Sequence, residues 1–169
     1  MKTSIKLFAL GMILAGFGIN AHAQVTGLAT ASATIVKPIA ISKSVDMNFG
    51  NVAVSTTSGT VVLATAGTRT KSGGVTLPGT AGTVTAATFD VTGEGNYTYT
   101  ISLPASISLT GSVSGTMVVD NFTSNPSETG TLASGSQTLK VGATLNVGGS
   151  QPAGTYTNAT DLKVTVNYN

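Results

Sequence analysis

The sequence contains no cysteine and no tryptophan, and its only histidine is His22. Without cysteine no disulfide can form. Beyond residue 22, zinc, copper and haem sites lose their usual ligands, and nucleophilic systems that depend on histidine are excluded. We therefore expect no metal, no cofactor and no enzymatic activity.

Charged residues are scarce too, at 8% of the chain. The acids are scattered and no two share a local motif: Asp46, Asp90, Glu94, Asp120, Glu128 and Asp161. A hydrolase that uses a pair of carboxylates is kept as a minor alternative.

The first residues have the pattern of a secretory signal peptide. Lys2 and Lys6 precede an apolar run over residues 7–19, and Ala21-His22-Ala23 is a small-x-small cleavage signal. We expect residues 1–23 to be removed between Ala23 and Gln24, which predicts export to the periplasm and then the cell surface. The apolar run is shorter than the roughly 20 residues that span a bilayer, so we expect no membrane span afterwards.

Removal of this segment changes the charge balance. Two of the eight basic residues leave with it, and the remaining six match the six acids. No basic stripe remains, so we expect no nucleic-acid partner.

Glycine, threonine, serine, valine and alanine dominate the rest of the chain, which is typical of β-structure with many turns. Short strands separated by turn clusters favour an antiparallel β-sandwich. The expected strands are Ala29–Val36, Ile39–Lys43, Met47–Val54, Thr60–Ala64, Gly74–Leu77, Val84–Thr92, Tyr97–Leu103, Ile107–Leu109, Thr116–Phe122, Thr138–Val147 and Leu162–Tyr168. We expect Tyr97 and Tyr99 to face the core, with a sugar-binding aromatic platform as the minor alternative. The loop that holds Arg69 and Lys71 is expected to be solvated.

The segment after the predicted cleavage site, residues 24–34, is expected to be extended; most of its side chains are small and none is charged. Pro38 then interrupts any ladder because it has no N–H. We expect an N-terminal extension over residues 24–34 and a sandwich domain over residues 35–169. The apolar residues of the extension are Val25, Leu28, Ala29, Ala31 and Ala33.

The last strand alternates strictly between apolar and polar residues. Its apolar residues are Leu162, Val164, Val166 and Tyr168. Successive side chains of a strand point to opposite faces, so this strand has one dry face and one wet face.

Several of these segments together resemble a known family. Met47-x-Phe49-Gly50 and the closing Gly154-Thr155-Tyr156 and Leu162–Tyr168 stretches resemble strands of spore-coat-U-like and archaic chaperone–usher pilin domains. The segments 118–122 and 138–145 are similar to a related secreted Gram-negative family that is known only as a domain of unknown function.

This resemblance implies an all-β, immunoglobulin-like, pilin-like sandwich that lacks its final strand. It implies a structural subunit of a surface filament (fimbria or pilus) or coat, assembled by addition of a donor strand. Residues 24–34 would be the donor, and Leu162, Val164, Val166 and Tyr168 would border the groove and face a periplasmic chaperone. The implied partners are other copies or related subunits, that chaperone and an outer-membrane usher.

Two alternatives stay open from the residues alone. The N-terminal extension can pair within its own chain or with a neighbour, and the final strand can simply complete a closed sandwich. A secreted, monomeric, adhesin-like or carbohydrate-binding module is the alternative function.

Overall fold

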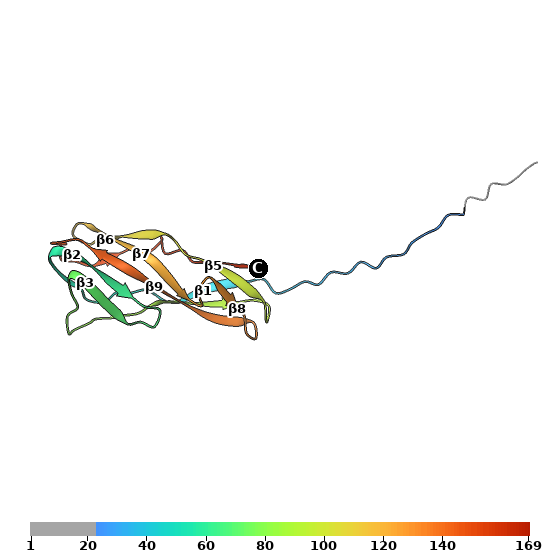
Figure 1. Ribbon diagram of the computed structural model, residues 1–169, viewed down its shortest axis with the longest axis horizontal. Helices are drawn as coiled ribbons and strands as arrows, with labels where there is room; N and C mark the ends of the chain where they lie inside the picture. Colours follow the sequence, from blue (N-terminus) through green and yellow to red (C-terminus); the bar gives the residue numbers. More distant parts are fainter. Residues whose placement is uncertain (1–22) are drawn as a thin grey trace, which may run out of the picture. The chain divides into compact units, whose positions relative to one another are not determined.

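The computed structural model describes residues 23–169, and within them all regular structure is β-strand (Figure 1). No helix in that range is long and apolar enough to cross a membrane. The strands are β1 (Ala40–Val45), β2 (Ala53–Leu63), β3 (Arg69–Thr76), β4 (Ala87–Thr92), β5 (Thr98–Ser102), β6 (Ser106–Gly111), β7 (Thr116–Asn125), β8 (Thr129–Thr131), β9 (Ser136–Val147), β10 (Tyr156–Thr157) and β11 (Thr165–Tyr168).

The chain divides into two units, Met1–Thr34 and Ile35–Asn169. The described part of the first unit, residues 23–34, contains no strand, and its side chains are exposed. The predicted strand Ala29–Val36 is therefore wrong, because a strand needs a backbone partner and this stretch has none among the described residues. The predicted signal peptide lies outside the described residues, apart from Ala23.

The second unit is an antiparallel β-sandwich, as the composition and turn spacing predict. An eight-stranded sheet has the order β1-β4-β9-β7-β6-β10, with the β2–β3 hairpin attached to β9. A three-stranded sheet has the order β11-β5-β8. All strand pairings are antiparallel.

Strand β9 is the centre of the large sheet. On one edge, its residues 136–141 pair with β4 and its residues 143–147 pair with β2. On the other edge, residues 140–146 pair with β7. Alternate residues of β9 are buried, as predicted from their period of two: Leu139, Val141, Ala143, Leu145 and Val147.

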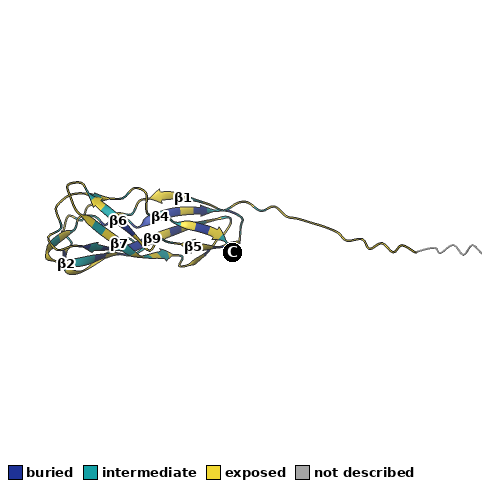
Figure 2. Ribbon diagram, turned by 90° about the horizontal axis from the view of Figure 1, so that it is seen from above, coloured by how far each residue is buried: buried dark blue, intermediate teal, exposed yellow. Residues whose placement is uncertain are grey.

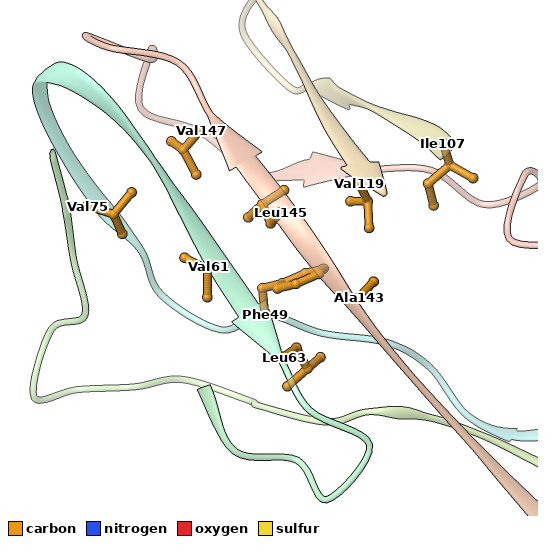
Figure 3. Packing of buried hydrophobic residues seen from close by; sticks show 9 residues of the cluster. All are labelled: Phe49, Val61, Leu63, Val75, Ile107, Val119, Ala143, Leu145 and Val147. Atoms are coloured by element: carbon orange, nitrogen blue, oxygen red, sulfur yellow. The ribbon is translucent and has the colours of Figure 1, made fainter. Parts of the chain in front are cut away.

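The core consists of two clusters. One gathers side chains from β2, β6, β7 and β9 around Phe49 (Figure 3). The other joins β4 and the first half of β9 to the small sheet through Tyr99, Leu132 and Val166. Figure 2 shows buried residues along β4 and β9 and exposed residues on β1. The small sheet supplies only the second cluster, so loop segments must cover the first.

Candidate functional site

A groove of about 1050 Å³ lies over the first core cluster. Residues 43–54 form one side, here called the first wall, and residues 151–162 form the other, here called the second wall. Most of both walls lies outside the strands of either sheet. The groove therefore lies where the second layer of the sandwich lacks a regular strand.

The floor of the groove is the inner face of the large sheet. It is formed by side chains of alternate residues on neighbouring strands: Ile107 and Leu109 of β6, Met117 and Val119 of β7, and Leu145 and Val147 of β9. The residues between them on β6, such as Ser108, are exposed on the opposite face. An occupant of the groove therefore meets an apolar floor.

The first wall is attached to the domain at Asn48. Its N–H donates to the carbonyl oxygen of Thr85 (2.8 Å), and the N–H of Thr85 donates back to the carbonyl oxygen of Asn48 (3.0 Å). Backbone groups of an extended chain alternate in direction, so those of Met47 and the N–H of Phe49 lie on the other side of the segment. Met47 and Phe49 both line the groove.

A sharp backbone turn follows at Gly50, which has a φ of 66°. A Cβ at this position would collide with the carbonyl oxygen of Ala81 and with Val84. Asn48 supports the turn, since its Oδ1 accepts from the Gly50 N–H (2.8 Å). Only glycine fits here, which gives a physical reason for the Met47-x-Phe49-Gly50 pattern.

Arg69 of β3 attaches the first wall to the hairpin behind it. Its Nη1 donates to the carbonyl oxygens of Phe49 and, over 3.0 Å, of Asn51. The prediction that this residue is merely solvated is wrong, because its side chain is half-buried against the wall. The contact joins residues far apart in the sequence, so no local pattern indicates it.

The second wall is held to β6 by β10. Tyr156 and Thr157 pair with Gly111 and Thr110, and the Ser112 N–H donates to the carbonyl oxygen of Thr155 (2.8 Å). By the alternation of an antiparallel ladder, the backbone groups of Tyr156 then point away from β6. Tyr156 lines the groove. The groove is thus flanked by strand-like backbone groups on both sides.

Side chains fix the course of the second wall. The Tyr156 hydroxyl donates to the carbonyl oxygen of Pro152 (2.7 Å) and accepts from Nε2 of Gln151 (3.0 Å). The Nδ2 of Asn158 donates to the carbonyl oxygen of Ser108 on β6 (2.7 Å). These contacts keep the wall at a set distance from the floor.

A local turn closes the second wall at Asp161. The Oδ1 of Asn158 accepts from the N–H groups of Thr160 (2.9 Å) and Asp161 (2.8 Å). The pKa of the Asp161 carboxyl is lowered, first by the hydrogen bond from Asn158 and then by that from Thr160. Asp161 is therefore an acceptor that stabilises the turn.

The predicted groove-bordering strand is divided between two places. Leu162 lines the groove, whereas Val164, Val166 and Tyr168 pack on the second core cluster. Their burial still alternates as predicted, with Val166 buried and Lys163, Thr165 and Asn167 exposed. The residues of the second wall, which precede this strand, were not expected to line the groove as a group because they lack any periodicity.

The outer edge of β11 has free backbone groups. The Asn169 N–H donates to the carbonyl oxygen of Thr98 on β5 (3.2 Å). The ladder therefore directs Asn167 and Thr165 toward β5 and leaves the backbone of Val166 and Tyr168 on the opposite edge. Within residues 23–169, no strand pairs with that edge.

The structure also describes the remaining predicted residues. In the N-terminal segment, Ala23, Gln24 and the five candidate donor residues are exposed: Val25, Leu28, Ala29, Ala31 and Ala33. Tyr99 is fully buried, as expected for a core residue. Tyr97 is 43% exposed, so the expectation that it faces the core is wrong, and the two side chains form no aromatic platform. The part of the chain that the structure describes contains no group of three or more His, Cys, Asp or Glu that could hold a metal ion.

A family model described as a domain of unknown function, DUF4402, matches residues 39–168. The chain belongs to this family. The match includes both walls of the groove and excludes residues 24–34. No curated protein and no solved structure matches the DUF4402 chain.

Proposed function

We propose that this DUF4402 protein is a structural, non-catalytic subunit of a cell-surface filament or coat. Its groove accepts an extended strand, and residues 24–34, here called the donor segment, supply that strand. The observation that carries the proposal is the groove with an apolar floor, flanked by the backbone groups of Met47 and the N–H of Phe49 on one side and the backbone groups of Tyr156 on the other.

Backbone geometry supports an extended occupant. A peptide that adds to a sheet edge gains main-chain hydrogen bonds, and pockets for its alternate side chains give specificity. Each such hydrogen bond contributes about 0.5–1.5 kcal/mol net. Exposed strand edges otherwise invite unwanted pairing, so a groove of this kind favours a dedicated occupant.

The donor segment matches the groove in charge and polarity. Residues 24–34 contain no charged side chain. The charges that line the groove, Lys43 and Asp46, pair with each other over 2.5 Å. Val25 shares a face of the extended segment with Ala29, Ala31 and Ala33, and its burial would contribute about 1.5–3 kcal/mol, each alanine much less.

The proposal includes the route to the cell surface. Residues 1–23 direct export, and a periplasmic chaperone fills the groove before an outer-membrane usher exchanges it for a donor segment. The support is an antiparallel sandwich with a groove where a strand is missing, in a chain whose segments resemble pilin domains. The donor segment pairs with other copies or related subunits.

Substitutions of opposite parity in the donor segment test this function. Ala31→Asp places a charge on the side that carries Ala29 and Ala33, and Thr30→Asp is the matched control on the other side. Both residues are exposed in the unassembled chain, so neither change should affect folding of the domain. Protein is purified from the cell surface or periplasm and run unheated on a denaturing gel.

We expect heat-sensitive ladders of oligomers from the parent chain and from Thr30→Asp. Ala31→Asp and a deletion of residues 24–34 should give monomer alone. Strictly monomeric parent protein that the deletion leaves unaltered would contradict strand addition. Equal ladders from both Asp variants would contradict the assigned parity.

A further inference from the structure

Three asparagines of the chain stand in an Asn-x-Thr motif whose middle residue is not proline. They are Asn96, Asn121 and Asn158. In an exported protein such a motif is an acceptor for an N-linked glycan when it lies on a surface loop. Glycan transfer also needs the side-chain amide nitrogen of the asparagine to be accessible and unengaged. The structure separates the three asparagines by this criterion.

The amides of Asn121 and Asn158 are both engaged. Asn121 lies within strand β7, and its Nδ2 donates to Oδ1 of Asp120 (3.0 Å). The half-buried Asn158 fixes the second wall, since its Nδ2 donates to the carbonyl oxygen of Ser108 (2.7 Å) and to Oδ2 of Asp161 (2.7 Å). Modification of either nitrogen would remove hydrogen bonds that the fold uses.

Asn96 lies at a turn in the loop between β4 and β5 and is exposed. The turn is held by its backbone: the Asn96 N–H donates to the carbonyl oxygen of Leu132 (2.7 Å), and the Tyr97 N–H donates to that of Glu94 (3.4 Å). The φ of Asn96 is 65°, which asparagine tolerates better than most residues. Within residues 23–169 its side chain makes no hydrogen bond, so the amide is free to react.

An acidic residue also distinguishes the Asn96 motif. Glu94 stands two residues before the asparagine, whereas Val119 and Tyr156 take this place before Asn121 and Asn158. Oligosaccharyltransferases of the bacterial periplasm accept the extended motif Asp/Glu-x-Asn-x-Ser/Thr. The added carboxylate can form a charge-assisted hydrogen bond with a cationic side chain of the enzyme. The complete extended motif occurs once in the chain, at residues 94–98.

The two flanking groups of the motif remain accessible. One carboxylate oxygen of Glu94, Oε2, accepts from the Lys37 N–H (2.9 Å), and the other makes no hydrogen bond within residues 23–169. Thr98 is exposed at the start of β5, where its hydroxyl oxygen accepts from Nδ2 of Asn169 (3.0 Å). Acid, amide and hydroxyl are therefore presented together at one turn of the surface.

We propose that Asn96 is an N-glycosylation site. The donor is an oligosaccharide linked to a polyprenyl diphosphate. Nδ2 of Asn96 attacks C1 of the first sugar, the new N–C1 bond replaces the C1–O bond to the diphosphate, the polyprenyl diphosphate leaves, and a base of the transferase takes one amide proton. None of residues 93–98 lines the groove, so the glycan leaves the groove free. This inference goes beyond strand addition and shares with the proposed function only export to the periplasm.

Glycan transfer to the purified full chain tests the inference without dependence on export. The chain is incubated with a bacterial oligosaccharyltransferase in detergent and a polyprenyl-diphosphate-linked oligosaccharide. A short peptide that contains Asp-x-Asn-x-Thr is the positive control for the enzyme. Intact-mass spectrometry counts the oligosaccharides added, tandem spectra of proteolytic fragments locate them, and circular dichroism shows that each variant is folded.

We expect a single oligosaccharide on the parent chain, attached to Asn96. Asn96→Asp keeps the size of the side chain and should abolish addition, as should Thr98→Val, which removes only the hydroxyl. Glu94→Gln retains an oxygen that can accept from the Lys37 N–H and removes the charge, so it should lower the initial rate by roughly tenfold or more. Asn121→Asp is the matched control and should leave the rate unchanged.

The contrary outcomes are distinct. A parent chain that stays unmodified while the control peptide is glycosylated would overturn the inference, and so would attachment at Asn121 or Asn158 in place of Asn96. Equal rates for the parent chain and Glu94→Gln would overturn the role of the carboxylate. Each of these results leaves strand addition untouched, because the gel ladders of the donor-segment variants test it separately.

Discussion

The side chain of Arg69 donates a hydrogen bond to the carbonyl oxygen of Asn51 over 3.0 Å and so joins strand β3 to the first wall of the groove. A second hydrogen bond runs from the same nitrogen to the carbonyl oxygen of Phe49. Phe49 is the aromatic centre of the core cluster beneath the groove (Figure 3). One cation therefore connects the hairpin, the wall and the core.

Removal of this contact should loosen the wall. We expect Arg69→Met to lower the free energy of unfolding by about 1–3 kcal/mol, because two carbonyl oxygens lose a charged donor. Lys71→Met is the matched control on the same strand, where the side chain is exposed, and should change stability by less than about 0.5 kcal/mol. Urea unfolding followed by circular dichroism measures both. Equal losses of unfolding free energy would contradict a stabilising role of the Arg69 hydrogen bonds.

Strand β11 should tolerate charge on one face only. Val166 is 8% exposed, so Val166→Asp places an unpaired carboxylate in the core and should cost about 3–5 kcal/mol. Val164→Asp, at a half-buried position, should cost less, and Lys163→Glu should be tolerated. The yield of folded protein and the urea midpoint report the order; a Lys163→Glu variant as damaged as Val166→Asp would refute the alternation.

Close backbone approach makes Gly142 sensitive to any side chain. A Cβ there would collide with the carbonyl oxygen of Leu63, where β2 and β9 meet. We expect Gly142→Ala to lower stability by about 1–3 kcal/mol through separation of these strands. Gly79→Ala, which has open space around it, should be neutral or slightly stabilising. Thermal melts of the two variants provide the test, and indistinguishable melting temperatures would count against this packing.

Tyr99 should make stability fall at alkaline pH. Burial raises its pKa above the usual 10.0, so the folded state favours the neutral phenol. Its contribution is fully present below about pH 10 and is lost as the pH rises through the folded-state pKa. The hydroxyl also donates to Oε1 of Gln137 (2.8 Å), an interaction that ionisation removes.

We therefore expect the difference in unfolding free energy between the parent chain and Tyr99→Phe to be constant from pH 7 to about pH 9 and to shrink above about pH 10. Urea unfolding at a series of pH values measures this difference. All residues other than Tyr99 are the same in the two proteins, so the comparison isolates the contribution of this one side chain. A difference that stays constant up to pH 11 would contradict the role of burial at Tyr99.

The sequence is most predictive where one strand carries its own pattern. Alternation in β9 and β11 correctly indicates which residues enter the core, because a period of two is imposed by the pleat of the strand itself. Strands β8 and β10 were not predicted, because strands of three and two residues are too short to show an alternation of apolar and polar residues. The sequence predicts two separate strands, Met47–Val54 and Thr60–Ala64, whereas Ala53–Leu63 is one strand, β2, whose partners in β3 and β9 decide its conformation.

The groove was less predictable than the sheets. Its floor follows from alternation, but its walls consist mainly of irregular backbone positioned by contacts such as that between Asn158 and Ser108. Interactions over such sequence separations leave no local signal. Alternation places Val164, Val166 and Tyr168 on the same face of the strand as Leu162. Only Leu162 lines the groove, because the following residues extend past its end and pack on the second core cluster.

The central position of β9 affects how the chain can fold. Strands β2, β4 and β7 all precede it in the sequence and all pair with it. A chain synthesised from its N-terminus cannot assemble the large sheet until residues 136–147 have emerged. We expect slow, late and all-or-none folding, as is typical of sheets built from distant pairings, with the earlier strands in need of protection from aggregation while they wait.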